Sequence, residues 1–331
     1  MKFIRPIVLV AMLVSLIIFG CTPQGGPDEN NTNQIPAPED VFPQEILTQI
    51  RFPYIIGANE LEITYIGNHG FLFSTLSKRI LIDSLTEIGG GYETTSRVIL
   101  SMLNEAGFPF NNIELALTTH SHGDHFEADR VIEFLLANPQ ATHLTTEEAE
   151  TTLQGATSFA QIASQSLGVT PDPNTRYRIE VAGMAVEVIR LDHHGVENYD
   201  HVAFMFTLNG IKVLHIGDAC KIPAQYEGLN LERENIDILI APFGSSCANW
   251  TVVGFEDDDP FEIINRFIRP KHIIVSHLDF ESTAADVQAI INTLSDRLPG
   301  ITFSAFHPVI LKQKIYVKEG NRIRVIDKPT S

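Results

Sequence analysis

The sequence predicts an α/β protein in which two mixed β-sheets lie together with helices on their outer faces. Short apolar and alternating runs, typical of strands, follow one another in residues 61–83, and strand-like runs alternate with helical periodicity from residue 113 onward. Because a sheet buries one face and a helix one stripe, such a series packs as two sheets covered by outer helices. Residues 46–331 are long enough to form one domain of this kind.

The period of the apolar residues defines the expected elements. Strands are predicted at residues 61–66, 70–74, 79–83, 113–118, 185–190, 202–208, 212–216, 236–240 and 272–275. Helices are predicted at residues 94–106, 127–136, 147–167, 261–267 and 283–298. Gly67 and Asn68 favour a turn between the first two strands. The Thr-Thr-Glu-Glu run at residues 145–148 is a capping-box pattern that would begin the third helix.

The first 21 residues predict export as a lipid-anchored protein. Two cations precede an apolar run at residues 7–19, which has the length of a signal-peptide core and not of a bilayer-spanning helix. The run ends in Ile-Phe-Gly-Cys, which resembles the lipobox of bacterial lipoproteins. We therefore expect a signal peptide at residues 1–20 and a mature protein held on the membrane by a lipid on Cys21, in the bacterial cell envelope outside the cytoplasm. A permanent N-terminal anchor helix is the alternative.

Residues 21–45 predict a tether between this anchor and the domain. The segment is rich in Pro, Asn, Gln, Gly and acidic residues and has few apolar ones. It cannot bury enough apolar surface to offset the entropy of ordering, so we expect a flexible linker.

The net charge limits the classes of possible substrate, and the cysteine content limits the possible disulfides. The formal net charge of −18 argues against nucleic acid as a substrate, because a phosphate backbone requires a basic surface. Besides Cys21, the chain contains Cys220 and Cys247. We expect these two thiols to be unpaired, and a disulfide between them is the alternative.

The most informative motif is Thr-His-Ser-His-Gly-Asp-His at residues 119–125. It places three histidines and one aspartate within six residues, a density that packing does not require. Imidazole and carboxylate groups are ligands of divalent ions, so the motif predicts a site for more than one metal ion. The motif lies between the strand at residues 113–118 and the helix at residues 127–136, which places its ligands on a loop at a strand end.

Three later strands are also followed by side chains that bind metals. The strand at residues 212–216 is followed by Asp218, and the strand at residues 272–275 by His277. The strand at residues 185–190 is followed by a pair of histidines. Each of these strand ends therefore offers one more ligand to the first motif.

With these residues the chain resembles the metallo-β-lactamase superfamily. The His-x-His-x-Asp-His signature of that superfamily and its three later ligands match seven residues in the expected order: His120, His122, Asp124, His125, His194, Asp218 and His277. Residues 63–67 and 80–83 also resemble the first strands of the family, so the resemblance covers about residues 58 to 312. It implies a four-layer αββα sandwich with a metal site along the strand ends.

The resemblance further implies two divalent ions. The first ion would be bound by His120, His122 and His194. The second ion would be bound by Asp124, His125 and His277, and Asp218 would bridge the two. Ligands rich in imidazole suit zinc, and manganese or iron are the alternatives.

The bridging carboxylate points to a hydrolytic reaction. Two cations joined by Asp218 would lower the pKa of a shared water, which becomes a hydroxide nucleophile, and Asp124 and Asp218 are the candidate catalytic residues. One large class of true β-lactamases has Cys where this chain has Asp218. The resemblance therefore implies hydrolysis of a phosphodiester, lactone or other ester, with a small-molecule or lipid-like substrate.

Within the superfamily, the layout is most similar to the branch that contains ascorbate-phosphate lactonase and N-acylphosphatidylethanolamine phospholipase D. A second hypothesis is a catalytically inactive, metal-containing binding or assembly lipoprotein of the same fold. The complete ligand set favours the enzyme, because a binding module needs no open coordination position.

The choice of one ligand between two neighbouring histidines remains open. Side chains of adjacent residues in an extended chain point to opposite faces, so only one of His193 and His194 can face the ions. We favour His194, because the glycine that follows it resembles a His-Gly pair of this branch, and His193 and His201 are the alternatives. We expect His215 to be buried and hydrogen-bonded, and His69 to line the cleft or to lie on a surface turn.

Overall fold

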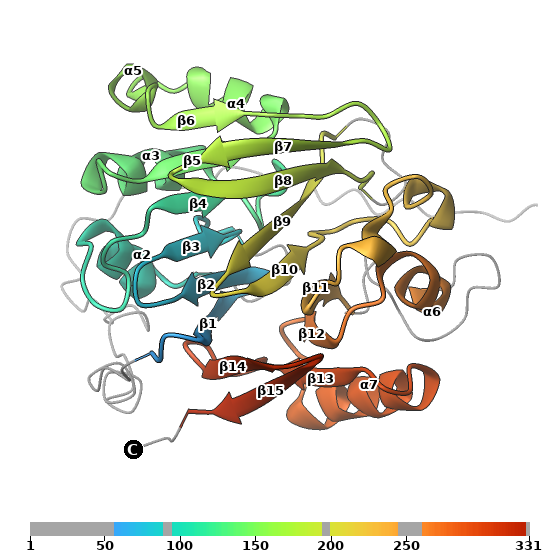
Figure 1. Ribbon diagram of the computed structural model, residues 1–331. Coiled ribbons are helices and arrows are strands. Elements are labelled where there is room, and N and C mark those ends of the chain that lie inside the picture. The colour runs from blue at the N-terminus through green and yellow to red at the C-terminus, as the bar shows by residue number, and fades with distance from the viewer. Residues whose placement is uncertain (1–55, 89–94, 194–198, 244–259, 329–331) are drawn as a thin grey trace, which may run out of the picture. The chain divides into compact units, whose positions relative to one another are not determined.

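Two β-sheets pack face to face, and helices cover the outer face of each sheet (Figure 1). The computed structural model describes residues 56–88, 95–193, 199–243 and 260–328, all of which belong to one compact unit. The predicted signal peptide, Cys21, the tether and Cys247 lie outside these residues, so the predictions made for them stay predictions. No helix in the described ranges is both long enough and apolar enough to cross a membrane.

The first sheet has eight strands in the order β15-β14-β1-β2-β3-β4-β5-β6. Their bounds are β1 Glu60–Gly67, β2 Gly70–Ser74, β3 Arg79–Ile82, β4 Leu115–Leu117, β5 Thr142–Thr145, β6 Ser166–Gly168, β14 Gln313–Glu319 and β15 Arg322–Asp327. Strands β3 to β6 are parallel, and β1 and β2 pair antiparallel with their neighbours. The carboxyl ends of β3 and β4 therefore lie at one edge, beside the β1–β2 turn.

The second sheet has seven strands in the order β13-β12-β11-β10-β9-β8-β7. Their bounds are β7 Arg176–Val181, β8 Met184–Arg190, β9 Val202–Leu208, β10 Ile211–His215, β11 Ile238–Pro242, β12 His272–Ser276 and β13 Thr302–Ala305. Strands β10 to β13 are parallel, and β9 runs antiparallel between β8 and β10. Strands β8, β10 and β12 consequently end at the same edge.

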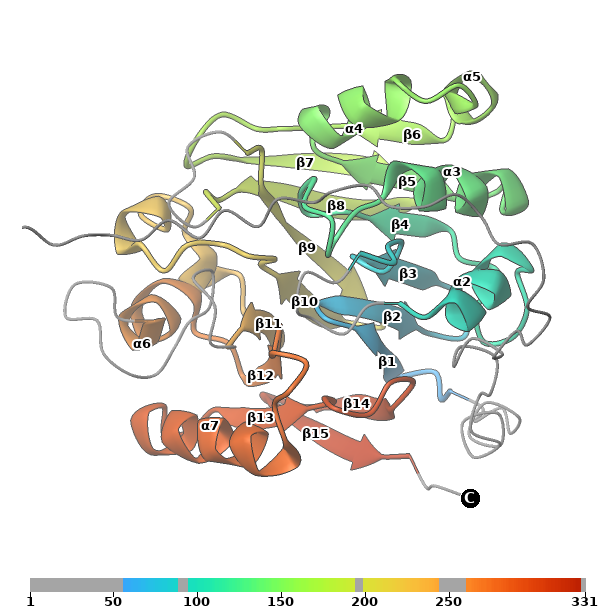
Figure 2. The ribbon, with the colours of Figure 1, turned by 180° about the vertical axis from the view of Figure 1, so that it is seen from behind.

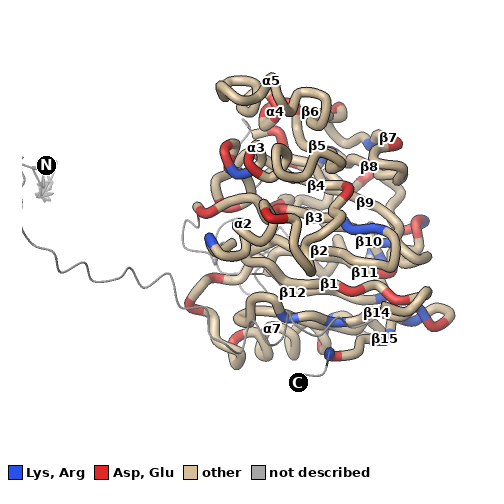
Figure 3. Tube along the Cα trace, turned by 90° about the vertical axis from the view of Figure 1, so that its left-hand side faces the viewer, with Lys and Arg blue, Asp and Glu red and all other residues tan. Residues whose placement is uncertain are grey.

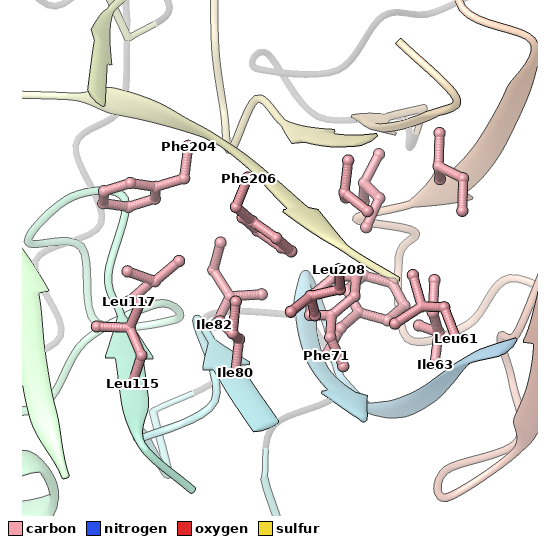
Figure 4. Close-up of a cluster of buried hydrophobic side chains, with 14 of the residues drawn as sticks. Leu61, Ile63, Phe71, Ile80, Ile82, Leu115, Leu117, Phe204, Phe206 and Leu208 are labelled. Carbon is pink, nitrogen blue, oxygen red and sulfur yellow. The ribbon is translucent and has the colours of Figure 1, made fainter. Parts of the chain in front are cut away.

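A continuous apolar layer holds the two sheets together (Figure 4). Side chains of β1 to β4, such as Phe71 and Ile80, meet side chains of β9, including Phe204 and Phe206. The ring of Phe73 packs edge-on against that of Phe206 with centroids 5.2 Å apart. Each fully buried side chain of this size contributes roughly 1.5–3 kcal/mol relative to exposure to water. Burial of alternate residues on both sheets thus fixes their face-to-face packing.

Helices cover the outer faces, as Figure 2 shows for the first sheet. The first sheet carries α2 Arg97–Asn104, α3 Ala128–Ala137, α4 Glu147–Gln154 and α5 Phe159–Ile162, and apolar residues of these helices join its outer core. The second sheet carries α6 Pro260–Glu262, the π-helical turn η3 Ile263–Ile268, α7 Ala284–Arg297 and the short 3-10 turns η1 Pro223–Gln225 and η2 Leu231–Arg233. The αββα sandwich predicted from the sequence is confirmed.

The prediction of one helix over residues 147–167 is wrong. The chain forms α4, then α5, then strand β6, because the helix ends at Gly155 and residues 166–168 pair with β5. The N-cap of α4 is Thr146, whose side chain accepts a hydrogen bond from the Ala149 backbone N–H. The helix therefore begins one residue later than a capping box from Thr145 to Glu148 would require, which leaves the Glu148 carboxylate for other contacts.

A buried carboxylate ties the sheets together at the edge away from the β10 and β12 carboxyl ends. Asp237, which directly precedes β11, accepts hydrogen bonds from Lys271 at 2.6 Å and from Lys318 of β14 at 2.7 Å. Figure 3 shows basic positions beside acidic ones in this part of the trace, near β10, β11 and β14. Burial alone would raise the pKa of Asp237, but the backbone N–H of Lys212 and the two lysines lower it.

His272 of β12 is a buried base that couples stability to pH. Its Nδ1 lies 2.7 Å from Thr302 Oγ1 and its Nε2 lies 2.8 Å from Ser304 Oγ. Burial lowers the pKa of His272 from 6.5 to about 3, and Lys314 contributes in the same direction. As the pH falls below 6.5, the unfolded chain takes up a proton that the folded protein does not, so acid favours the unfolded state over this interval.

We expect the free energy of unfolding of the metal-free protein to fall between pH 7 and pH 5, and the His272→Asn variant to lose less over that interval. One imidazole accounts for at most about 1.4 kcal/mol per pH unit, so the stability gap between the two proteins should narrow by up to that amount per unit. Urea denaturation at several pH values measures the gap. A gap that does not change with pH would contradict this assignment.

Candidate metal centre

The metal-type side chains predicted from the sequence converge at one edge of the sandwich, where the strand ends of both sheets meet (Figure 1, Figure 2). The loop after β4 carries the histidine-rich motif, and the loops after β8, β10 and β12 carry His193, Asp218 and His277. A hydrogen bond from the Val202 backbone N–H to Thr119 O, 3.0 Å long, joins the start of β9 to the start of the loop after β4. The two halves therefore contact each other directly at this edge.

One group of possible ligand atoms consists of imidazoles alone. His120, His122 and His193 each offer a ring nitrogen, and these atoms lie within 4.8 Å of one another. His120 and His193 are buried, and among the described residues neither His120 Nε2 nor either ring nitrogen of His193 has a hydrogen-bond partner. A buried nitrogen without a partner is costly unless a ligand satisfies it, so this group fits a metal ion.

A second group combines carboxylates with imidazoles. Asp124, His125, Asp218 and His277 likewise offer ligand atoms within 4.8 Å of one another. Asp218 Oδ2 lies 3.1 Å from His277 Nε2 and 3.4 Å from His125 Nε2. Asp124 Oδ2 lies 3.4 Å from each of the same two nitrogens. Mixed nitrogen and oxygen ligation of this kind fits zinc and other divalent ions of the first transition row.

Asp218 is shared between the groups. Besides the two contacts above, its Oδ2 lies 3.6 Å from Nε2 of His193, a member of the first group, while its Oδ1 is buried and has no hydrogen-bond partner among the described residues. One carboxylate thus reaches both sets of imidazoles, which is the arrangement needed to bridge two ions.

The loop that presents Asp218 depends on a glycine. Gly217 has a φ of 52°, in the left-handed region, and a Cβ at this position would lie 2.6 Å from His201 Nε2 and 2.9 Å from Thr119 Cβ. Only glycine lets the chain turn there without a clash. This is the structural reason for the Gly-Asp pair that the sequence displays after the strand.

The charges of the second group balance one another. Burial alone would lower the pKa of His277, but Asp218 and Asp124 raise it to about 9. Burial is likewise outweighed at His125, whose pKa is raised well above 6.5 by Asp218, Asp124 and Asp83. In return, the histidines hold the pKa of Asp218 well below its usual range although burial opposes this shift. The metal-free site therefore holds protons where cations would bind, and metal uptake releases them.

Two imidazoles of the first group have lowered pKa values, in contrast to the histidines of the second group. Burial lowers the pKa of His120 well below 6.5, with His125 adding to the shift, and burial also lowers the pKa of His122. Both rings are therefore neutral near pH 7, which is the protonation state that binds metal.

Asp83 is a positioning residue that was not predicted from the sequence to be part of the site. It directly follows β3, and its Oδ2 lies 3.0 Å from His125 Nδ1. The same carboxylate accepts hydrogen bonds from the Thr119 backbone N–H and from Thr119 Oγ1, each 2.8 Å long. Asp83 thereby turns the Nε2 of His125 towards the site and anchors the start of the ligand loop. The signal available in the sequence was the Ile-Leu-Ile-Asp run, which ends a strand in an acid.

Two further residues support the site. Asn68 Nδ2 donates to Asp124 Oδ2 at 3.1 Å, and its backbone oxygen accepts a hydrogen bond from the His277 N–H at 3.4 Å. His201 is fully buried, and its Nε2 accepts a hydrogen bond from the Asp218 backbone N–H at 3.0 Å. Burial lowers the pKa of His201 to about 3, so the ring is neutral and its Nδ1 donates to Leu191 O. Their supporting roles depend on contacts between distant segments, which the sequence pattern does not reveal.

The structure places most of the sequence-predicted site residues together. His120, His122, Asp124, His125, Asp218 and His277 all lie in the two groups. His194 lies outside the described residues, so its assignment as a ligand stays a prediction, while the adjacent His193 occupies a position in the first group. His215 is buried and hydrogen-bonded to His69 O at 2.9 Å, as expected. His69 is fully buried, so the surface-turn interpretation of that residue is wrong.

Comparison with known proteins agrees with this geometry. The model of the beta-lactamase superfamily domain matches residues 62–274, so the chain belongs to the beta-lactamase superfamily. No curated protein matches the chain closely enough to count as a relative.

Solved structures share the fold. Igni18, a metallo hydrolase from the archaeon Ignicoccus hospitalis, is 16% identical with a TM-score of 0.55, and the match covers 78% of this chain and 100% of that one. A protein from Veillonella parvula, described as a possible metal-dependent hydrolase, is 16% identical with a TM-score of 0.50, and the match covers 76% and 98%. Family membership and the two ligand groups together define an enzyme of the metal-dependent hydrolase class.

The choice between the two neighbouring histidines can be tested directly. Because His193 lies among the ligand atoms, we expect His193→Ala to lose about one bound ion per chain and His194→Ala, its matched control, to keep both. Elemental analysis of each variant after saturation with zinc and removal of free metal gives the stoichiometry. Loss of an ion from the His194 variant alone would show that His194, the residue favoured from the sequence, is the ligand.

Proposed function

We propose that the protein is a hydrolase that uses two divalent metal ions to cleave a phosphodiester, lactone or other ester. The observation that carries this proposal is the position of Asp218, whose Oδ2 lies within 3.6 Å of imidazole nitrogens from both ligand groups. A protein that only bound a metal would not need two adjoining groups joined by a shared carboxylate. The set is therefore best explained by catalysis.

The proposed ligands follow the geometry. His120, His122 and His193 would hold one ion, and Asp124, His125 and His277 would hold the other, with Asp218 reaching both. Zinc suits this set, and manganese or iron would also accept it. When bound, such ions act as Lewis acids that polarise the ester and make water a better nucleophile near neutral pH.

The chain's own residues would orient the reaction. Asp124 is the more exposed of the two carboxylates, with 16% of its side chain accessible against 5% for Asp218. Asn68 holds its Oδ2 in place, so Asp124 is the carboxylate best placed to orient the attacking water by accepting a hydrogen bond. Asp218 stays buried between the imidazoles and keeps its negative charge, which fixes the two groups at a constant separation.

The identity of residue 218 also bears on the substrate. A carboxylate there, in place of the Cys of one large class of β-lactamases, supports ester or phosphodiester cleavage over β-lactam opening. The finer assignment, to the branch with ascorbate-phosphate lactonase and N-acylphosphatidylethanolamine phospholipase D, is part of the same proposal and rests on the arrangement of motifs. A small-molecule or lipid-like ester is the substrate we propose.

We expect Asp218→Ala to reduce hydrolysis of bis-p-nitrophenyl phosphate or of a lactone on the order of 10³-fold or more, because the two cations would lose their common ligand. Treatment with a chelator should abolish the same activity, and added zinc should restore it. Asp296→Ala, an exposed change on α7, is the control and should retain full activity.

The outcomes separate the alternatives. Activity that survives both Asp218→Ala and metal removal would overturn the mechanism. Strong turnover of nitrocefin would contradict our interpretation of residue 218. Stoichiometric metal binding without activity on any ester, thioester or phosphodiester would favour the inactive binding lipoprotein.

We also propose that the protein acts in the bacterial cell envelope, anchored through a lipid on Cys21. The support is the apolar run at residues 7–19 and the Ile-Phe-Gly-Cys sequence that ends it. Expressed as the full chain in a bacterium, the wild-type protein should fractionate with membranes, and Cys21→Ser should prevent processing at that site. Cys220→Ser is the control and should behave as wild type. Normal processing and lipid labelling of the Cys21 variant would contradict the proposal.

A further inference from the structure

Glu148 contacts both halves of the fold with one side chain. It lies in the first turn of α4, where Oε1 accepts a hydrogen bond from Ser121 Oγ at 2.9 Å and Oε2 accepts one from the Asp200 backbone N–H at 2.7 Å. Ser121 stands between His120 and His122 in the loop from the first sheet. Asp200 stands just before β9 of the second sheet. A single carboxylate therefore joins the ligand loop to the opposite half.

Two further side chains hold Asp200, one from each half. Its Oδ1 accepts a hydrogen bond from Arg190 Nη1 at 2.6 Å, and its Oδ2 accepts one from Thr170 Oγ1 at 3.1 Å. Arg190 is the last residue of β8, the strand that leads to His193. The segment that Glu148 contacts is thus fixed to the strand that supplies the third imidazole.

The residue after Asp200 extends the connection to the shared carboxylate. His201 donates from Nδ1 to Leu191 O at 2.9 Å and accepts at Nε2 from the Asp218 N–H at 3.0 Å. Leu191 lies two residues before His193. Contacts from residues 200 and 201 therefore reach the backbone beside two proposed ligands of the second half.

The two ligand groups differ in what joins them across the halves. The group with Asp124 and His277 has Asn68, which contacts both of them. For the group of His120, His122 and His193, the described hydrogen bonds between the halves include those of Glu148, the bond from Thr170 Oγ1 to Asp200 and the backbone bond from Val202 to Thr119. Removing Glu148 would therefore affect mainly the spacing of the all-histidine group.

Both contacts of Glu148 suit a carboxylate, because an ionised carboxylate accepts at both oxygens, here from an O–H and an N–H. A glutamine could keep both contacts, since its amide oxygen can accept from the Asp200 N–H and its NH₂ group can donate to the serine hydroxyl, which is also an acceptor. A Glu148→Ala change, by contrast, removes both contacts.

We propose that Glu148 is a positioning residue of the metal centre, which fixes the distance between the His120–His122 loop and His193 and thereby sets the affinity of that group for its ion. This inference rests on the proposed function, since it assumes a metal at the site. The expected size is that of other groups that orient metal ligands, about 10- to 100-fold in metal affinity.

The test is a titration of the metal-free protein with Co²⁺ in competition with a chromophoric chelator. We expect wild type to bind two ions per chain, and Glu148→Ala to bind one of them about 10- to 100-fold more weakly, with altered visible absorption of that cobalt. Ser121→Ala removes the other end of the contact and should have a similar effect without changing Glu148. Glu147→Ala, an exposed neighbour in the same helical turn, is the matched control and should bind as wild type.

Each outcome decides a separate question. Wild-type protein that takes up no metal overturns the proposed function and this inference with it. Two ions bound with wild-type affinity by both Glu148→Ala and Ser121→Ala overturn the positioning role and leave the proposed function intact. If the variants weaken metal binding only in proportion to a lowered melting temperature of the metal-free protein, Glu148 has a structural role alone. Weakened binding at an unchanged melting temperature supports the inference.

Discussion

The metal centre depends on one buried carboxylate oxygen, Asp218 Oδ2, which lies 3.1–3.6 Å from imidazole nitrogens of His125, His193 and His277. These three rings come from three strand ends, one in the first sheet and two in the second. An ionised carboxylate is expensive to bury unless it is paired, so its position is stable only when cations or imidazolium groups surround it. Asp218 thus requires the two sheets to meet with their carboxyl edges together, and that requirement connects the fold to the chemistry.

The apolar layer between the sheets makes this meeting possible. Parallel strands that end at one edge bring their following loops into one place, and interdigitated side chains such as Phe73 and Phe206 hold the edges in register. At the other edge, Asp237 joins Lys318 of the first sheet to the second sheet. Packing far from the site therefore limits changes in the distances between the ligands, because the loops that carry them are attached to two closely packed sheets. This rigidity suits a site whose ligands must keep a fixed geometry.

Around the ligands, polar side chains convert that coarse alignment into a specific orientation. Asp83 turns His125, Asn68 orients Asp124, and His201 supports the backbone of Asp218. Each supporting side chain is itself buried and paired, so its orientation costs little additional entropy when metal arrives. The proposed role of Glu148 is of the same kind, although its side chain is only half-buried and contacts both halves. Loss of support of this kind typically costs about 10- to 100-fold in metal affinity or activity.

The sequence by itself determined the fold class and most of the ligand set, because both depend on patterns within short stretches of the chain. Alternation and helical spacing report burial residue by residue, and the motif around His120 places several ligands within one turn of chain. Strands β5, β6, β7 and β13 to β15 were not predicted. The three or four residues of β5, β6 and β13 carry too little periodicity and pair only in the assembled sheet. That His193 lies among the ligand atoms, that Asp83 and Asn68 support the site, and that Glu148 contacts both halves, only the tertiary structure decided. Those facts depend on contacts between segments far apart in the chain, and a hydrogen bond between distant residues leaves no periodic trace in either of them.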